Sequence, residues 1–221
     1  MKDAFFSWEE YEHTPLFSKC YYPWEAFLYL QDYIKSLNLE PIKQHLFPDA
    51  YFIHPELILV GKGTVIEPGS YIQGPCVLGK RCQVRHGAYI RGSLVAGDDC
   101  IIGHGTEVKN AIFFNSTVAA HFNYVGNSIL GSHVNLGAGV KCANLRLDRQ
   151  PIWVDWEGKK VDTGLVKLGA IIGDFSQVGC NSVLNPGTLL GKNSICLPCS
   201  NVQGSIFQKG LFKPAVKHCM E

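Results

Sequence analysis

Apolar residues recur every six positions through most of this chain, and this period constrains the possible folds more than any other feature. The first apolar positions are Val60, Ile66, Ile72, Leu78, Val84, Ile90, Ala96, Ile102 and Val108. The register slips by two between Val108 and Ile112 and then resumes at Val118, Tyr124, Leu130, Leu136 and Cys142. After an interruption the period returns at Val166, Ile172, Val178, Leu184, Leu190 and Cys196. This pattern predicts a parallel β-helix whose coils contain three short strands and about 18 residues each.

Glycine commonly follows the apolar position, as at Gly61, Gly79, Gly97 and Gly103. We expect the apolar side chain to point into the prism. We expect the glycine to support a tight corner, where a positive φ is inexpensive only for a residue without Cβ. Residues beside an inward position should then point outward, because successive side chains of a strand face opposite sides.

Composition narrows the class of protein. The chain has 221 residues and a net charge of +1, and it has no apolar run near the length of about 18 residues that spans a membrane. Neither nucleic acid nor a membrane is therefore an expected partner. Nine cysteines are scattered along the chain, and the first residues, MKDAFFSWEEYEH, are acidic and aromatic, unlike a signal peptide. These features predict a reduced, cytoplasmic protein.

The six-residue period divides the chain into three parts. Residues 1–50 lack the period, and the stretch 24–37 carries an apolar stripe with helical spacing. We expect this helix to form an N-terminal cap over the open end of the solenoid, or to contact another subunit, because an open end exposes strand edges and apolar core. Residues 51–207 form the predicted β-helix, and residues 208–221 form a short C-terminal tail.

One segment, residues 145–165 (LRLDRQPIWVDWEGKKVDTGL), interrupts the coils. Two short runs flank Glu157-Gly158, a pair typical of a hairpin turn, so the sequence predicts a β-hairpin. Long insertions in compact folds commonly serve a function. This insertion either contributes to a site or only grips a neighbouring subunit, and the sequence leaves both interpretations open.

Charged residues gather around one predicted strand. Glu107 and Lys109 flank the inward Val108, and Arg91 follows the inward Ile90. Arg91 and Lys109 are 18 residues apart, so they should stack on one outer face, one coil apart. Two stacked cations repel unless an anionic group lies between them. We therefore expect a phosphate or carboxylate ligand there, with two solvated side chains as the alternative.

Two histidines raise a metal-binding alternative. His86 and His104 are also 18 residues apart and should stack outward. The γ-class carbonic anhydrases, which are left-handed β-helix trimers, bind zinc through three histidines, but the third ligand of their pattern is missing here. The single C-x-x-C motif from Cys196 to Cys199 lacks a second pair. We therefore expect no metal site.

Residues 109–145, KNAIFFNSTVAAHFNYVGNSILGSHVNLGAGVKCANL, resemble the acetyltransferase half of the bifunctional bacterial enzyme that makes UDP-N-acetylglucosamine. That half is a glucosamine-1-phosphate N-acetyltransferase with hexapeptide repeats. The family pattern is a Lys, a His-x-x-Tyr-x-Gly block, an Asn-x-Gly-Ala-Gly block and an Asn-Tyr pair. This chain carries Lys109, the blocks 121–126 and 135–139, and Asn144-Leu145, and the match continues without gaps back to Arg91.

The resemblance implies an all-β, left-handed β-helix that forms a homotrimer with sites in clefts between subunits. It implies acetyl transfer from acetyl-CoA to the amine of glucosamine-1-phosphate or a related amino-sugar phosphate. Arg91 and Lys109 would hold the sugar phosphate, and Tyr124, Asn135 and Asn144 would contact the substrate. The hexad count points Tyr124 inward, whereas this role needs it in the site.

The resemblance also assigns the catalytic groups. His121 would be the general base that takes a proton from the substrate amine, and Glu107 would orient its imidazole. An amine attacks a thioester only when it is neutral, and histidine is well suited to accept a proton near neutral pH. On the acetyl-CoA side, the resemblance implies contacts from Ala138, Asn144 and Cys180.

The chain departs from the family pattern on the CoA side. Leu145 stands where the family has Tyr, Cys180 corresponds to a Ser, and the Arg that binds the CoA phosphate has no clear counterpart. We also expect this chain to lack the nucleotidyltransferase domain of the family, so that uridyl transfer would need a separate nucleotidyltransferase partner. A non-catalytic trimeric scaffold or regulatory subunit is therefore the alternative function.

Overall fold

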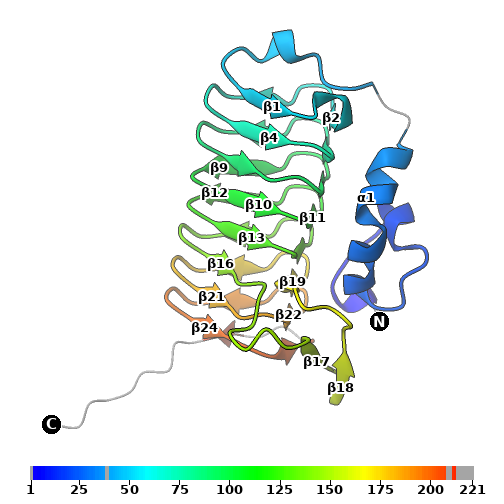
Figure 1. Cartoon of the computed structure of the whole chain (residues 1–221). Helices are drawn as coiled ribbons and strands as arrows, with labels where there is room; N and C mark the ends of the chain where they lie inside the picture. Colours follow the sequence, from blue (N-terminus) through cyan, green and yellow to red (C-terminus); the bar gives the residue numbers. More distant parts are fainter. Residues whose placement is uncertain (1, 38–39, 208–210, 213–221) are drawn as a thin grey trace, which may run out of the picture.

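The chain winds into a prism of stacked coils (Figure 1). The structure is a computed structural model that describes residues 2–37, 40–207 and 211–212. Within these residues, three parallel sheets of eight strands each form the sides of the prism. They are called sheets A, B and C, and every coil passes from sheet B to sheet A to sheet C. The predicted parallel β-helix is confirmed.

Each sheet takes one strand from every coil. Sheet A contains β2 (Ile58–Val60), β5 (Cys76–Leu78), β8 (Leu94–Ala96), β11 (Ala111–Phe113), β14 (Ile129–Leu130), β19 (Ala170–Ile172), β22 (Thr188–Leu190) and β25 (Ser205–Ile206). Sheet B contains β1 (Tyr51–Ile53), β4 (Tyr71–Gln73), β7 (Tyr89–Ile90), β10 (Glu107–Lys109), β13 (Tyr124–Gly126), β16 (Lys141–Cys142), β21 (Val183–Leu184) and β24 (Asn201–Val202). Sheet C contains β3 (Val65–Ile66), β6 (Gln83–Val84), β9 (Ile101–His104), β12 (Val118–His121), β15 (Asn135–Leu136), β20 (Gln177–Val178), β23 (Ile195–Cys196) and β26 (Leu211–Phe212).

The remaining elements lie outside the three sheets. They are the helix α1 (Ala26–Ser36), the 3-10 turns η1 (Lys2–Ala4), η2 (Thr14–Phe17), η3 (Pro23–Glu25), η4 (Gln44–Leu46) and η5 (Pro55–Leu57), and the hairpin strands β17 (Trp153–Trp156) and β18 (Lys159–Asp162). In the described ranges, no helix has the length and apolar character needed to cross a membrane. Most of the predicted C-terminal tail lies outside the described residues.

Part of the predicted register is wrong. The residues that point into the prism are Ala119 and Val125, both fully buried, rather than Val118 and Tyr124. The chain takes two five-residue steps, 108–113 and 125–130, so the coils around them hold 17 residues. Tyr124 therefore lies on the outer face, as its place in a site requires. Val166, also predicted to point inward, is 48% exposed outside the coils.

The glycines after the inward positions serve a different purpose from the one predicted. Gly79 and Gly103 do not have positive φ angles. A Cβ on either would instead overlap the backbone of the next coil, at Gly97 and Ala120. These glycines are needed for the close approach of successive coils. The left-handed backbone occurs two residues further along each edge, as at Gly105, with φ +62°.

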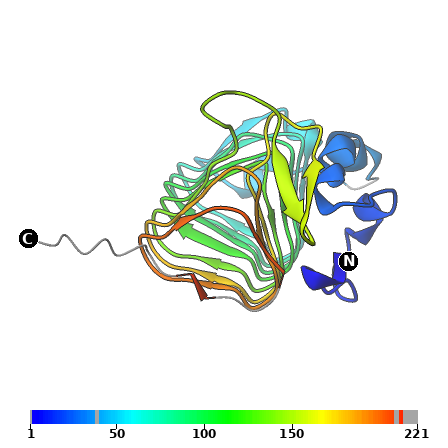
Figure 2. The same ribbon diagram turned by 90° about the horizontal axis from the view of Figure 1, so that it is seen from below.

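The N-terminal segment, residues 2–37, covers the outer face of sheet A, and its predicted position as an end cap is wrong. Figures 1 and 2 show α1 and the turns before it alongside the prism. The outward residues of sheet A are themselves apolar and buried: Leu59, Val77, Val95, Ile112, Ile129, Ile171 and Leu189. A sheet that is apolar on both faces must be covered on both, which explains why the segment packs there.

The open end of the prism is closed by a different segment. Ile42, Phe47, Ala50 and Phe52 pack against the first coils of the core. The end cap expected of the helix is therefore provided by residues 42–52, which lead into the first strand and include part of it.

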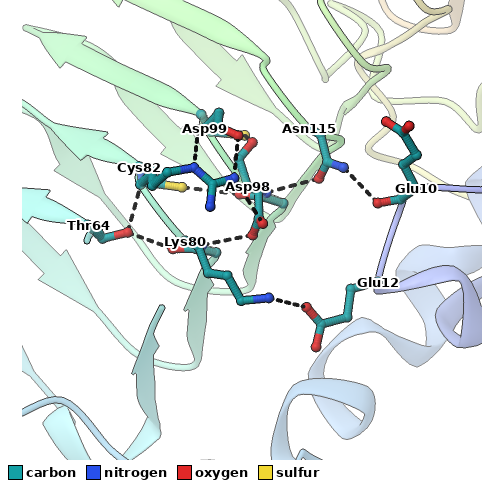
Figure 3. A network of polar contacts seen from close by, with 12 residues as sticks. Glu10, Glu12, Thr64, Lys80, Cys82, Asp98, Asp99 and Asn115 are labelled. Carbon is teal, nitrogen blue, oxygen red and sulfur yellow. Dashed lines mark hydrogen bonds and ion pairs between the residues drawn. The ribbon is translucent and has the colours of Figure 1, made fainter. Parts of the chain in front are cut away.

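Polar contacts fasten the N-terminal segment to the coils along one edge (Figure 3). The Asn115 side-chain amide donates to the Glu10 carbonyl oxygen over 2.8 Å, and Lys80 Nζ lies 3.7 Å from a Glu12 carboxylate oxygen. Asp98 accepts a hydrogen bond of 2.8 Å from the backbone N–H of Lys80. Arg81 pairs with Asp99 through two bonds of 2.7 Å. The same edge thus links adjacent coils to each other and to the segment.

The insertion forms the predicted hairpin, with β17 and β18 antiparallel around Glu157-Gly158. Its buried face packs within its own chain, because Trp156 stacks on Phe5 at 5.7 Å and meets Trp24 edge to face at 5.4 Å. The other side stays open to solvent, and Trp153 is 55% exposed. The hairpin therefore extends the cover of sheet A formed by the N-terminal segment.

His13 should make the packing of the N-terminal segment depend on pH. It is buried, and its Nδ1 lies 2.9 Å from the Tyr33 hydroxyl. Burial lowers the pKa of His13 from its ordinary 6.5, although the charges of Glu12 and Asp98 oppose part of that shift. The unfolded segment therefore takes up a proton more readily than the folded one. The stability that comes from burying neutral His13 is therefore fully present above pH 6.5. It is lost as the pH falls from 6.5 toward the lower pKa of the folded state.

Thermal unfolding measured from about pH 8 to about pH 5 checks this prediction. The wild type should lose stability below pH 6.5, and His13→Phe, which cannot bind a proton, should lose less over the same range. Parallel pH profiles for the two proteins would rule out His13 as the source of the dependence.

Candidate functional site

The outer face of sheet B carries a charged cluster. Arg91 and Lys109 lie in register one coil apart, since the Arg91 N–H donates to the Val108 carbonyl and Val108 pairs with Ile90. The Arg91 guanidinium Nη1 donates to Glu107 Oε1 over 2.7 Å. The one carboxylate of this cluster is thus paired with Arg91.

Positive charge exceeds negative charge in this cluster. In the part of the chain that the structure describes, no carboxylate pairs with the Lys109 ammonium. Lys141 on β16 adds a third cation, directly in register with Tyr124, and its Nζ donates to the Gly139 carbonyl over 2.6 Å. Lys141 was not among the predicted site residues, although its distance of 17 residues from Tyr124 becomes a signal once the coil length is known. A face with this charge balance favours an anionic ligand.

Tyr124 and Asn144 meet beside the charged cluster. The Tyr124 hydroxyl donates to Asn144 Oδ1 over 3.4 Å, and Asn144 Nδ2 donates to Asn127 Oδ1 over 2.7 Å. Burial, followed by the negative charge of Glu107, raises the pKa of Tyr124, so the phenol stays protonated at neutral pH. Gly126 makes room for this pair, because a Cβ there would come within 2.7 Å of both the hydroxyl and the Asn144 amide.

His121 ends β12, at the edge where sheet C passes into sheet B, and its side chain is exposed. Buried Asn123 fixes the backbone at this edge. Its Oδ1 accepts from the His121 N–H over 3.2 Å, and its Nδ2 donates to the Gly137 carbonyl over 2.7 Å. Asn123 was not among the predicted site residues, since a buried Asn within the six-residue repeats has no distinctive spacing.

The structure brings some of the predicted site residues together and separates others. Glu107 is bound to Arg91, and within the described residues its carboxylate makes no hydrogen bond to the imidazole of His121. Asn135 lies opposite Val118 on sheet C, a different side of the prism from the charged cluster. One chain alone therefore does not gather every predicted substrate contact.

Side-chain size changes along the edge that carries His121. On the preceding coils the edge holds His86 and His104, whose rings stack at 5.6 Å with planes 6° apart. On the following coils it holds half-buried Ala138 and exposed Cys180, so the edge becomes shallow. A Cβ on Gly139 would overlap the side chain of Asn181, so glycine is needed there for the close packing of the two coils. The edge next to His121 thus carries bulky imidazole rings on one side and small side chains on the other.

The stacked histidines do not form a metal site with the residues around them. Their Nδ1 atoms lie 2.7 and 2.8 Å from the carbonyl oxygens of Pro68 and His86. Across the described ranges, no group of three or more His, Cys, Asp or Glu side chains is arranged to hold a metal ion. The zinc alternative thus has a stacked pair with His121 next in register on the following coil, but within the described residues these three imidazoles are not arranged to hold a metal ion. Cys196 points into the core and Cys199 is exposed, so the C-x-x-C motif is split between inside and outside.

A cavity of about 420 Å³ lies on another edge, between the coils and the N-terminal segment. Its lining includes the Arg81–Asp99 pair and Asp174. Buried Asp174 accepts bonds from the N–H groups of Ser7 and Ser132, at 2.7 and 2.8 Å. These charged groups are thus paired with partners from the protein itself, so their presence in the cavity is explained without a ligand.

The coils, their spacing and the edge residues define a hexapeptide-repeat protein. Residues 72–210 match the family model described as the GMPPB C-terminal domain, which is well over half of the chain, and the chain belongs to this family.

Three curated relatives are similar in sequence to parts of this chain. The "Bifunctional protein GlmU" of Methanococcus maripaludis strain C5 is 40% identical over 103 residues, which are 45% of this chain and 25% of that protein. The "Bifunctional sugar-1-phosphate nucleotidylyltransferase/acetyltransferase" of Sulfurisphaera tokodaii is 33% identical over 105 residues, 48% of this chain and 26% of that protein. The "Putative uncharacterized acetyltransferase YaiX" of Escherichia coli K12 is 30% identical over 166 residues, 75% of this chain and 70% of that protein. The chain thus spans about a quarter of the length of the bifunctional relatives.

Proposed function

We propose that this chain is an N-acyltransferase that moves an acetyl group from acetyl-CoA to the amine of an amino-sugar phosphate such as glucosamine-1-phosphate. The observation that carries the proposal is the excess of positive charge on sheet B, one coil away from the exposed imidazole of His121. The likeness to bifunctional GlmU proteins and to YaiX supports the choice of acetyl transfer. The reduced cytoplasm expected from the cysteine pattern is where acetyl-CoA would be available.

His121 is the general base in this proposal. Its imidazole accepts a proton from the amine nitrogen as that nitrogen forms its bond to the acyl carbon, and it can return the proton to the departing thiolate. Arg91 and Lys109 bind the phosphate of the acceptor and so fix its amine beside His121. The Tyr124 hydroxyl and the Asn144 amide supply neutral hydrogen bonds to the sugar.

The edge beyond His121 fits the pantetheine arm of acetyl-CoA, which supplies the acyl thioester. Ala138, Gly139 and Cys180 leave the edge shallow there, whereas the rings of His86 and His104 fill it on the other side. The Lys141 ammonium, beside Gly139, is placed to attract the phosphates of the donor. Lys141 would thus act where the resembled family uses an Arg that this chain lacks.

A homotrimer would complete the site. Asn135 lies on sheet C, so it can meet a ligand held on sheet B only if a second copy places its sheet C against that face. Sheet A is covered by the N-terminal segment, which leaves sheets B and C for contacts between copies. Closed cyclic symmetry then accommodates three equivalent contacts.

The homotrimer predicts a sedimenting species of three times 24.4 kDa at micromolar concentration. Sedimentation equilibrium over a range of protein concentrations measures it. A species that stays at 24.4 kDa throughout would remove the shared site.

A binding subunit without catalysis is the second candidate. The specific observation in its favour is the engagement of Glu107 with Arg91, since an imidazole base commonly relies on a carboxylate to orient it. Leu145, which stands where the resembled family has an aromatic residue, also favours a binding subunit without catalysis. Such a subunit would bind the sugar phosphate and leave acetyl-CoA intact.

A thiol-release assay separates the two candidates. The chain is mixed with acetyl-CoA and a panel of amino-sugar phosphates, and free CoA thiol is measured over time. The enzyme proposal expects release that depends on the amino sugar and is absent with the N-acetylated sugar. Calorimetric binding of the sugar phosphate without any thiol release would favour the binding subunit.

Arg91→Ala and Lys109→Ala should each weaken binding of the sugar phosphate about ten- to a hundredfold, or about 1.5 to 3 kcal/mol. Each cation gives the phosphate a charge-assisted hydrogen bond, and Arg can give two. The free amino sugar, which lacks phosphate, should bind almost unchanged. Calorimetric titration of both ligands measures this, with Arg85→Ala as the control because Arg85 is a surface cation bonded to Gln83. An equal loss of affinity for the phosphorylated and the free amino sugar would show that the two cations do not recognise the phosphate.

A further inference from the structure

A column of tyrosines runs along the outer face of sheet B and ends at the charged cluster. Tyr51, Tyr71 and Tyr89 are in register on β1, β4 and β7, and the next residue of the column is Glu107. Tyr51 is 64% exposed and Tyr89 is 41% exposed. The Tyr71 and Tyr89 rings meet edge to face, with centroids 5.1 Å apart. Aligned rings that remain open to water on one flat face are typical of a binding surface.

Arg91 joins the tyrosine column to the cations. Its Cζ lies 5.8 Å from the centroid of the Tyr89 ring, while its Nη1 donates to Glu107. The guanidinium is therefore held from two sides. A guanidinium has five N–H donors in a planar fork, so groups remain to bind an anion while these contacts persist. A phosphate on Arg91 would then lie directly beside the exposed Tyr89 ring.

We propose that Tyr89 and Tyr71 stack on the base of a nucleoside, and that the acceptor is an amino sugar joined to this nucleoside through a diphosphate. The inference rests on the proposed function and names its substrate class more closely. Along the prism, the edge that carries His121 is followed by Lys109, then by Arg91 and Tyr89 together on one coil, and then by Tyr71 on the next, with neighbouring coils about 4.8 Å apart. A nucleoside-diphosphate sugar has its amine, phosphates and base in the same order.

The chemistry of the column suits a base better than a second sugar. Every nucleobase has a π face that stacks on tyrosine rings and guanidinium planes, and such stacking tolerates different bases. Tyr71 and Tyr89 provide rings, and Arg91 provides the guanidinium next to the phosphates. A bare sugar phosphate would end at Arg91 and leave the tyrosine rings in water.

Calorimetric titration with three probes tests the proposal: inorganic diphosphate, uridine 5′-diphosphate and adenosine 5′-diphosphate. In the wild-type protein both nucleotides should bind about tenfold or more tightly than inorganic diphosphate, the gain expected from one stacked base. Tyr89→Ala should lose most of this gain and keep its affinity for inorganic diphosphate. Tyr89→Phe, which retains the ring, should behave as wild type. Tyr29→Ala, on the helix that covers sheet A, is the matched control and should change neither affinity.

The outcomes separate this inference from the function on which it rests. If neither nucleotide binds more tightly than inorganic diphosphate, the stacking site is wrong and the amino-sugar phosphate proposal stands. If inorganic diphosphate itself does not bind, or binds equally to Arg91→Ala, the phosphate site fails and the proposed function fails with it. If Tyr89→Ala leaves nucleotide binding intact but changes the sedimenting mass, the column is a contact between copies and the proposal is overturned.

Discussion

His121→Ala should lower kcat for acetyl transfer by about 10² to 10⁴ with little change in the KM for the sugar phosphate. A general base acts chiefly in the transition state, whereas in the proposed site the phosphate is bound by Arg91 and Lys109 on the neighbouring coils. Steady-state thiol release, measured at several concentrations of the acceptor, gives both constants. His133→Ala is the control, because His133 is an exposed imidazole on another edge, where it stacks on Phe175 at 4.9 Å. Near-normal turnover in His121→Ala would remove His121 as the base.

Glu107→Gln distinguishes two ways in which this carboxylate could serve the reaction. The amide keeps a hydrogen-bond acceptor for Arg91 but loses its charge. If Glu107 acts by holding Arg91, as its 2.7 Å bond indicates, the main effect falls on the KM for the sugar phosphate. If Glu107 instead orients His121 in the assembled protein, kcat falls and its pH profile shifts. Either effect should be smaller than that of His121→Ala.

The fold was predictable because a solenoid repeats its packing. Each inward position meets the same environment, so a residue such as Ile90 or Leu184 is apolar for the same reason in every coil. The errors arose where that repeat changes by one residue. The sequence predicted one slip of two residues after Val108, whereas the chain takes two steps that are each one residue short, so Tyr124 was assigned inward although it points outward. The predicted and observed registers agree again at Leu130, because the two short steps together equal the predicted slip.

The place of the N-terminal helix was not predicted, although its signal was in the sequence. The strands of sheet A are apolar at successive positions, as in Leu94–Ala96, whereas a strand with one solvated face alternates. The six-residue period describes only the inward positions, so it did not reveal that the outward residues of sheet A are apolar as well. The helix was therefore assigned to the open end, although it covers the side of the prism.

The candidate site was only partly predictable from residue spacing. A distance of 18 residues placed Arg91 beside Lys109, because stacked coils put equal phases of the repeat side by side. Residue spacing could not show whether Glu107 would pair with Arg91 or with Lys109, since that depends on side-chain rotamers. It also could not reveal Lys141 without the 17-residue coil length.

Phe114→Ala should destabilise the docked N-terminal segment by about 3 to 5 kcal/mol, the usual range for removing a buried phenylalanine. Phe114 is fully buried where a coil leaves sheet A. Its ring stacks on Phe6 at 4.5 Å and on Tyr11 at 3.9 Å, and it also meets Trp8 and Phe17. It is thus the coil residue that contacts four aromatic side chains of the segment. Truncation would leave a cavity that those rings cannot fill without moving.

Hydrogen exchange locates this loss as well as measuring it. Amides of residues 2–37 should exchange faster in Phe114→Ala, while amides in sheets B and C, which do not depend on the segment for cover, should keep most of their protection. Phe175→Ala is the matched control on the same edge, since that ring is 50% exposed and its loss should cost about 1 kcal/mol or less. Because sheet A is apolar on its outer face, the opened variant should also expose an apolar surface and associate at high concentration. Unchanged protection of residues 2–37 would mean that the segment is held chiefly by its polar contacts at Asn115 and Lys80.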